Sequence, residues 1–163
     1  MEEINKKEEY IYSTQNGVDK IKQALKHVID IEIPQNSKEI ASARSQGDLR
    51  ENFAYKIAKE QRLTLLSKMT ELKTELSRVK IIKPEEVSTD KVNIGTEIKL
   101  QATNNKKEVY TILGPWDRDS KKKVISYLAP FAKALLGKKR GEKVLFEGKT
   151  YKILEISCAK MKN

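Results

Sequence analysis

Apolar positions recur at alternating steps of three and four over residues 55–79. The members of this series are Tyr55, Ala58, Arg62, Leu65, Met69, Leu72, Leu76 and Val79. The spacing is that of a heptad seam, the pattern with which two helices pack along their length. Arg62 is its charged member, and we expect its methylenes to lie against the partner helix while its head reaches solvent.

A second helical stripe precedes this seam. Its apolar members, also at intervals of three and four, are Val18, Ile21, Leu25 and Val28. Pro34 interrupts the stripe, because a proline inside a helix removes a backbone hydrogen bond and kinks the rod. Helical spacing resumes with Ile40 and Ala43, and Gly47 then separates the two patterns. We predict an antiparallel coiled-coil hairpin, whose arms of about 30 residues would place the turn about 45 Å from the base.

After Lys83-Pro84 the chain changes to short segments rich in β-branched residues. Such segments, separated by turn sequences such as Gly114-Pro115, indicate strands. We expect them at residues 94–102, 108–113, 123–127, 143–146 and 151–156. Residues 130–136 have the spacing of one short helix, ended by Gly137. The sequence thus predicts an α+β chain with a flexible lead-in at 1–13, the hairpin at 14–82 and a sheet domain at 83–163.

Composition favours this two-part organisation and adds a charge asymmetry. Only 38% of the 163 residues are hydrophobic, which is low for one compact globule of this length. The formal net charge is +10; residues 1–82 contribute +2 (15 basic, 13 acidic) and residues 83–163 contribute +8 (18 basic, 10 acidic). We therefore expect a polyanionic partner, most simply nucleic acid or a nucleoprotein surface, attracted chiefly by the second half.

Several classes of protein are excluded by what the chain contains. The single cysteine, Cys158, rules out an internal disulfide framework, and no Cys and His cluster predicts a structural zinc site. The single histidine, His27, lies in the first helical pattern and is expected to pack or face solvent. No stretch approaches the roughly 20 apolar residues that cross a membrane, and the start of the chain is too charged for a secretory signal. A cytoplasmic location is expected.

Two carboxylates three residues apart, Asp48 and Glu51, follow Gly47 in the predicted turn. One interpretation is a capping arrangement, in which Asp48 accepts from the first amides of the second helix and Glu51 reaches back to the cap residue. The other is a functional acid pair held at the end of a long hairpin. The two are compatible in part, since a capping side chain can turn to a metal that a partner presents.

Two longer motifs now give the chain a family resemblance. The first runs from Ser45 to Asn52 and continues to Tyr55, and the second runs from Pro130 to Lys138, with Gly141 and Glu142 beyond it. In this order, on a helical hairpin and then a small sheet domain, they resemble the bacterial Gre transcript-cleavage factors over about residues 14–156. The resemblance implies an amino-terminal coiled coil and a small FKBP-like antiparallel sheet domain with one short helix.

The resemblance also implies a function. Gre factors bind backtracked RNA polymerase, insert the coiled coil through its secondary channel and help the polymerase's own active centre hydrolyse the extruded RNA 3′ end. On this basis the catalytic residues are Asp48 and Glu51, which would share a magnesium ion with the polymerase and would not hold it stably alone. Carboxylates suit that ion, because two-metal phosphodiester hydrolysis depends on a shell of hard oxygen ligands. The chain would itself be no enzyme, and we expect a monomer.

The remaining site residues follow from the same resemblance. Tip support is assigned to Gly47, Leu49, Asn52 and Tyr55; contact with the RNA end to Arg44, Arg50, Lys56, Lys59 and Arg62; and docking on the polymerase to Leu128, Ala129, Pro130 and Phe131. Each has a plainer alternative: a braced loop for the tip residues, a solvated basic face for the cations and a core position for Phe131.

The chain departs from the family pattern in two places. Family members commonly have serine where Ala129 stands, so a hydroxyl is missing there. They often carry an acidic residue at the position of Ala54 and a small one at that of Phe53, so this tip is less acidic. Because the tip is less acidic, an alternative function stays open: a homologue that plugs the secondary channel and inhibits RNA polymerase.

Two further functions are open. One is an FKBP-like prolyl isomerase or chaperone module, although 6% aromatic residues poorly supply its proline pocket. The other is a nucleic-acid-binding coiled-coil protein without a polymerase partner.

Overall fold

The computed structural model describes residues 10–47 and 51–161. Most of the predicted lead-in, and the predicted site residues Asp48, Leu49 and Arg50, lie outside the described residues. The chain divides into two compact units: one comprises residues 20–77, and the other joins the segment up to Asp19 to the chain from Arg78 onward.

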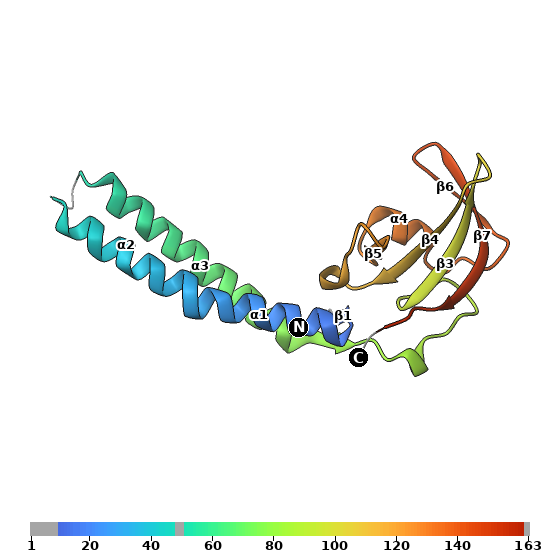
Figure 1. Ribbon diagram of the computed structural model, residues 1–163, viewed down its shortest axis with the longest axis horizontal. Helices are drawn as coiled ribbons and strands as arrows, with labels where there is room; N and C mark the ends of the chain where they lie inside the picture. The colour runs from blue at the N-terminus through green and yellow to red at the C-terminus, as the bar shows by residue number, and fades with distance from the viewer. Residues whose placement is uncertain (1–9, 48–50, 162–163) are drawn as a thin grey trace, which may run out of the picture. The chain divides into compact units, whose positions relative to one another are not determined.

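Residues 20–77 form the helical hairpin (Figure 1). Its first arm contains the end of α1 (Gln15–His27), a π-helical turn η1 (Val28–Glu32) and α2 (Ile33–Ser45), and its second arm is α3 (Phe53–Arg78). The backbone stays helical through Glu32 and Ile33, and the Ile33 amide donates to the Val28 carbonyl, so the rod is continuous into α2. The interruption predicted at Pro34 takes the form of a π-helical turn directly before it.

The predicted heptad seam is confirmed by burial. Every member of the series from Tyr55 to Val79 is buried or half-buried, with Ala58 and Leu72 the most enclosed. Contacts from the first arm run in the opposite direction along the chain, since Glu32 pairs with Lys68 and Asn36 with Ala58. The arms are therefore antiparallel, as predicted.

Arg62 corrects one expectation about this seam. Its half-buried head does not extend freely into solvent but bonds to the first arm: Nε donates to Asn36 Oδ1 at 2.8 Å, and Nη2 donates to the Ile33 carbonyl at 3.3 Å and to the Ser37 hydroxyl. The reason is Asn36, which is only 2% exposed and donates its amide to the Ala58 carbonyl at 2.9 Å. A buried amide must find partners for its oxygen as well as its nitrogen, and Arg62 supplies the donor for the oxygen.

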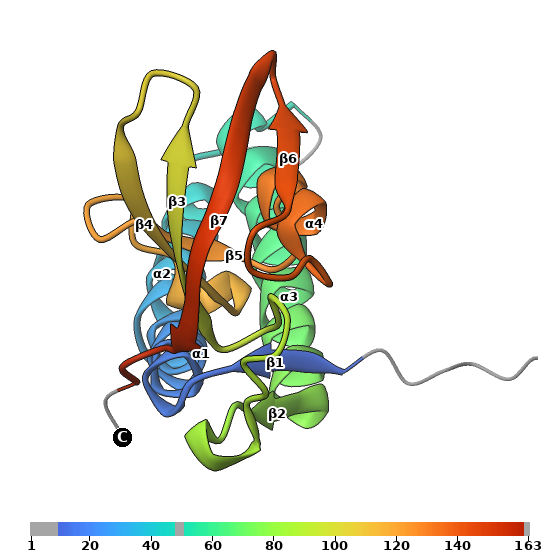
Figure 2. The same ribbon diagram turned by 90° about the vertical axis from the view of Figure 1, so that its right-hand side faces the viewer.

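The second unit is built on a five-stranded sheet of order β5-β4-β3-β7-β6 (Figure 2). Its strands are β3 (Thr96–Ala102), β4 (Lys107–Leu113), β5 (Val124–Ser126), β6 (Lys143–Phe146) and β7 (Lys149–Cys158). The α+β fold is confirmed, but the sheet is mixed rather than wholly antiparallel, because β5 pairs parallel with β4. The connection between them passes through the 3-10 helix η3 (Pro115–Asp117) and a further turn, so β5 returns to the sheet in the direction of β4.

The short helix α4 (Pro130–Leu135) packs its inner side on this sheet. The core around it consists of Val92, Ile98, Leu100, Ile112, Ala132, Leu135, Val144 and Ile153. Leu135 is fully buried.

Residues 11–13 differ from the predicted flexible lead-in. They form β1 (Ile11–Ser13), which pairs parallel with β2 (Val79–Ile81), directly after α3. Beyond β2 a short 3-10 helix, η2 (Pro84–Glu86), begins at the predicted Pro84 break.

A buried carboxylate fixes the segment that follows β1. Asp117 is 7% exposed and accepts from the Ser13 hydroxyl at 3.1 Å, the Thr14 amide at 3.0 Å, the Gly114 amide at 3.2 Å and the Thr14 hydroxyl. The Thr14 hydroxyl in turn accepts from the Gly17 amide, which caps α1. A Cβ on Gly17 would lie 2.0 Å from Ser13 Oγ, so a glycine is required there.

Candidate functional site

The hairpin tip is organised by Asn52. Its side-chain oxygen accepts from the Tyr55 amide at 3.0 Å, and its carbonyl accepts from the Lys56 amide at 3.1 Å, so Asn52 is the N-cap of α3. Its Nδ2 donates to the Ala43 carbonyl at 2.6 Å, in the last turn of α2, where that carbonyl also accepts from the Gln46 amide at 3.3 Å. One side chain thus closes the end of one helix and the start of the next.

This arrangement changes the interpretation of the two acids. A capping box with Asp48 at the cap would place Glu51 at the third helical position, but α3 begins at Phe53 and Glu51 precedes the cap. Glu51 is exposed in the bend before Asn52. Gly47, at the other side of the turn, has φ 152°, which L-residues rarely adopt. Asn52 therefore caps this helix, and Glu51 lies outside the position that the predicted capping box requires.

A groove of about 570 Å³ runs along one face of the hairpin below the tip. Its lining residues are Ser37, Ile40, Arg44, Tyr55, Lys59, Arg62 and Leu63. The Arg44 guanidinium carbon lies 5.6 Å from the centre of the Tyr55 ring, and the Lys59 ammonium lies 5.4 Å from it. Arg44 also donates to the Tyr55 hydroxyl at 3.4 Å, and this hydrogen bond lowers the pKa of the Tyr55 phenol. Cations gathered on an aromatic ring suit a single-stranded nucleic acid, which needs both phosphate and base contacts.

The predicted basic residues do not all share this groove. Arg44, Lys59 and Arg62 all line it, and the Arg62 head is at the same time bonded to Asn36. Lys56 does not line it, because its ammonium lies 5.7 Å from the centre of the Phe53 ring. Arg50 lies outside the described residues.

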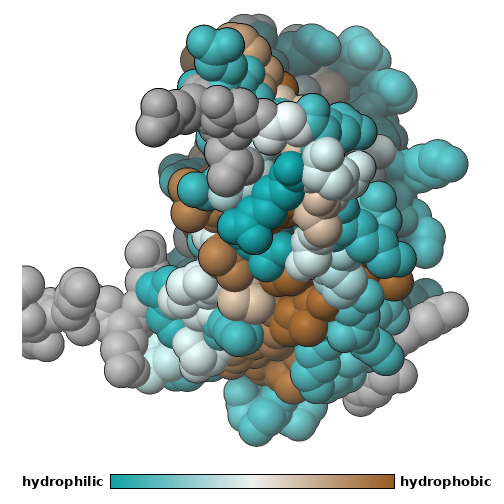
Figure 3. All heavy atoms as spheres, turned by 90° about the vertical axis from the view of Figure 1, so that its left-hand side faces the viewer, coloured by the Kyte–Doolittle hydropathy of each residue, from teal (hydrophilic) through white to brown (hydrophobic). Residues whose placement is uncertain are grey.

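The other face of the hairpin has a different character. Its groove, of about 560 Å³, is lined by Gln35, Lys38, Glu39, Ser42, Ala43, Gln46, Ala54, Ile57, Ala58 and Gln61. Lys38 and Glu39 cancel in charge, and the rest are neutral. Apolar side chains reach the surface at the start of α3, where Phe53 is 77% and Ile57 54% exposed. Figure 3, which faces the tip end of the hairpin, shows hydrophobic patches among hydrophilic residues.

Three of the four predicted docking residues line a groove in the sheet unit. This docking groove, of about 790 Å³, is bordered by Pro115, Arg118, Ser120, Val124, Ile125, Ser126, Leu128, Ala129 and Pro130. Ala129 is the N-cap of α4 and offers no side-chain hydrogen bond, as its missing hydroxyl predicts. The Ser126 hydroxyl accepts from the Leu128 amide at 3.1 Å, in the segment before the helix.

Phe131, the fourth predicted docking residue, packs inward. Its ring lies 5.2 Å from that of Tyr110, 4.9 Å from that of Phe146 and 5.1 Å from that of Tyr151, measured between centroids. The core alternative describes Phe131. The same packing fills the inside of the sheet with the protein's own aromatic rings.

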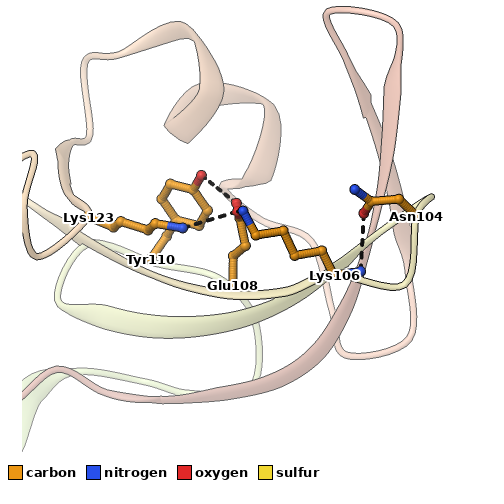
Figure 4. A network of polar contacts seen from close by, with 5 residues as sticks. All are labelled: Asn104, Lys106, Glu108, Tyr110 and Lys123. Atoms are coloured by element: carbon orange, nitrogen blue, oxygen red, sulfur yellow. Dashed lines mark hydrogen bonds and ion pairs between the residues drawn. The ribbon is translucent and has the colours of Figure 1, made fainter.

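A charged network beside this cluster was not predicted (Figure 4). Glu108 Oε1 pairs with the ammonium groups of Lys106 at 3.0 Å and Lys123 at 3.1 Å, and Glu108 Oε2 accepts from the Tyr110 hydroxyl at 2.9 Å. The bond to Lys106, followed by those to Tyr110 and Lys123, lowers the pKa of Glu108 to about 2. Burial and the bond to Glu108 raise the pKa of Tyr110 to about 12. The sequence did contain one signal of this network: Glu108 and Tyr110 are two residues apart on a predicted strand, so their side chains lie on the same face.

Two further findings concern metal ligands and membrane-spanning helices among the described residues. Within residues 10–47 and 51–161, no three His, Cys, Asp or Glu side chains gather as a metal site. None of the helices in those ranges is both long and apolar enough to cross a membrane. At the tip, Glu51 offers a hard oxygen ligand in an exposed position, which fits a partial shell for a magnesium ion that another molecule holds.

Comparisons with known proteins identify relatives over nearly the whole chain. Two family models match: "Transcription elongation factor, N-terminal" over residues 11–81 and "Transcription elongation factor, GreA/GreB, C-term" over residues 86–158. Transcription elongation factor GreA of Treponema pallidum is 40% identical over 145 residues, covering 86% of this chain and 90% of its own. GreA of Thermodesulfovibrio yellowstonii is 36% identical over 149 residues, covering 88% and 94%. GreA of Chlamydia trachomatis is 41% identical over 150 residues, and this chain, matched over 92% of its length, spans only 21% of that relative.

Proposed function

Because the chain belongs to the GreA/GreB family of transcription elongation factors, we propose that it stimulates transcript cleavage by backtracked bacterial RNA polymerase. It enters the secondary channel with the hairpin tip and acts on the polymerase's own active centre, so that the chain has no turnover alone. It works as a monomer in the cytoplasm, with the nascent RNA 3′ end as the substrate.

The observation that carries this proposal is that two neighbouring residues at the tip, Asn52 and Glu51, have different surroundings. Asn52 performs the capping and bracing, and Glu51 stands exposed beside it. An exposed carboxylate fixed next to a braced helix start is suited to orient a water or a metal-bound group. With Asp48 it would complete the shell of a magnesium ion held mainly by the polymerase, where such an ion activates water and steadies the leaving oxygen. Which acid contacts the ion and which orients the water is left open.

The groove below the tip is assigned to the RNA end. Arg44 and Lys59 offer charge to phosphate, and the Tyr55 ring beside them offers an aromatic contact to a base. Arg62 is proposed here as a positioning residue, because its head closes the seam. The docking groove at Leu128, Ala129 and Pro130 is assigned to the polymerase surface outside the channel.

The alternative functions have less support. The relatives are named elongation factors, which does not favour an isomerase, and Phe131 and its neighbours fill the space that a proline pocket would need. An inhibitor that plugs the channel needs no carboxylate pair. It is the alternative to test, because Phe53 and Ala54 make this tip less acidic than is usual in the family.

The test uses stalled, backtracked polymerase complexes with end-labelled RNA and magnesium. We expect the wild-type chain to shorten the RNA from its 3′ end, and Asp48→Asn to reduce this strongly. Glu60→Gln, which neutralises an exposed carboxylate on the body of α3, should cleave like wild type. Binding to the polymerase without shortening would favour the plug, and shortening undiminished in Asp48→Asn would contradict the catalytic assignment.

A further inference from the structure

The docking groove has two borders that come from different elements. One border is β5 and the turn before it, with Val124, Ile125 and Ser126; the other is the segment Leu128, Ala129 and Pro130 that opens α4. The connection between them is held by hydrogen bonds from the Tyr127 amide to the Leu113 carbonyl and from the Ala129 amide to the Ser126 carbonyl, both at 2.9 Å. The width of the groove depends on how each border sits on β4.

Glu108 on β4 reaches the first border through Lys123. The Lys123 ammonium lies 3.1 Å from Glu108 Oε1, and Lys123 is the residue directly before β5. Its backbone has φ 53°, a left-handed conformation that costs a non-glycine residue energy. Such a conformation persists only where the surroundings hold it. Here the Thr111 amide donates to the Lys123 carbonyl at 3.1 Å, and Glu108 holds the ammonium.

The same carboxylate reaches the second border through Tyr110. Tyr110 donates its hydroxyl to Glu108 Oε2 at 2.9 Å, and its ring meets that of Phe131 edge to face at 5.2 Å. Phe131 is the second residue of α4 and follows Pro130 directly. The Lys123 ammonium also lies 5.2 Å from the centre of the Tyr110 ring, so the two connections share a ring and a carboxylate. Figure 4 shows Lys123, Tyr110 and Lys106 converging on Glu108.

From this geometry we infer that Glu108 is a positioning residue for the docking groove: it presets both borders for binding a protein surface. The inference rests on the proposed function, since it takes the groove as the docking site. Glu108 is 15% exposed at its side chain, and two ammonium groups meet at one of its oxygens. If its charge is removed, those two cations repel each other, and Lys123 is released from the turn that precedes β5. The borders of the groove then adopt a wider range of conformations in the free protein. The affinity for polymerase falls, because binding must restrict the groove to one conformation.

The experiment measures two quantities for each full-length variant: the affinity for polymerase, by competition with a labelled wild-type chain, and the maximal cleavage rate at saturating factor. We expect Glu108→Gln to weaken affinity about five-fold, a typical coupling within a charged network, and to leave the maximal rate unchanged. Lys123→Met should weaken affinity similarly. The double variant should bind polymerase with an affinity no lower than that of the weaker-binding single variant, because both substitutions remove the same connection. Glu155→Gln, an exposed carboxylate on β7, is the matched control and should bind like wild type.

Local hydrogen exchange separates positioning from general stability. In Glu108→Gln we expect faster exchange at the amides of Leu128 and Ala129, with the core amide of Ile98 unchanged. Uniformly faster exchange across the sheet would contradict the inference, as would an affinity equal to that of Glu155→Gln. Leu128→Ser tests the proposed docking site itself. If Leu128→Ser binds normally, the docking assignment fails; if it binds weakly while Glu108→Gln binds normally, only the positioning role fails.

Discussion

Replacing Asn52 should reveal how the tip is braced. In Asn52→Ala, α3 loses its N-cap bond to the Tyr55 amide and α2 loses the bond to the Ala43 carbonyl. An N-cap is worth about 1 kcal/mol, and a second partly buried hydrogen bond about 1 kcal/mol more. We therefore expect the free energy of unfolding to fall by about 2 kcal/mol. Asn52→Ser keeps a capping oxygen but is too short to reach Ala43, so it should lose about 1 kcal/mol.

Urea unfolding followed by circular dichroism measures both values, and hydrogen exchange at the Tyr55 and Lys56 amides reports whether the tip opens locally. Exchange at Tyr55 should rise in Asn52→Ala and much less in Asn52→Ser, because only the alanine variant lacks a cap. Equal destabilisation by the two variants would refute the assignment of two separate bonds. Losses below about 0.5 kcal/mol with unchanged exchange would refute the bracing role altogether.

Three further perturbations test other parts of the structure. Asp117→Asn should lower the free energy of unfolding by about 2 kcal/mol, measured by urea unfolding, because an amide cannot accept from all the buried donors around it, Ser13 among them; an unchanged midpoint would contradict this. Asn36→Ala and Arg62→Met should each destabilise the hairpin and be strongly non-additive in a double-mutant cycle, whereas additive losses would show that they act separately. The pKa of Glu108, about 2 against an ordinary 4.5, lies lower in the folded state, so its contribution is present above about pH 4.5 and is lost as pH falls toward 2; Glu108→Gln should flatten that part of the stability profile, and an unaltered profile would contradict the ion pairs.

Much of the fold was predictable because its signals are local. The heptad series from Tyr55 to Val79 marks each residue of one seam, and the burial of every member follows from helical periodicity alone. The strands and α4 were bounded by proline and glycine at positions such as Pro130 and Gly137, so their limits were close to those observed.

The features that were missed depend on partners distant in the sequence. β1 is three residues long and pairs with β2 across the whole hairpin, so residues 11–13 carry no periodicity of their own. Asn36 is a polar residue at a seam position, and only the position of Arg62 on the other arm makes its burial acceptable. The parallel pairing of β5 likewise depends on the route through η3.

The site was predictable in residue type and less so in role. The acids and the basic side chains around the turn were found by spacing and resemblance, but the capping interpretation was placed on Asp48 and Glu51, whereas Asn52 was expected only to brace the loop. Sequence alone does not decide at which residue α3 begins, and that one boundary decides which side chain can cap. The inward packing of Phe131 was not decided by the sequence for a similar reason, because an exposed docking aromatic and a core aromatic have the same spacing in a six-residue helix.

The most direct test of the tip assignment is one variant measured in two ways. Glu51→Gln should change the free energy of unfolding by less than about 0.5 kcal/mol, since Asn52 performs the capping. The same variant should bind backtracked polymerase normally and lose most of its stimulation of RNA cleavage at saturating factor. Full cleavage by Glu51→Gln, or a loss of stability of the size of a missing cap, would contradict the conclusion that Glu51 stands at the tip for catalysis.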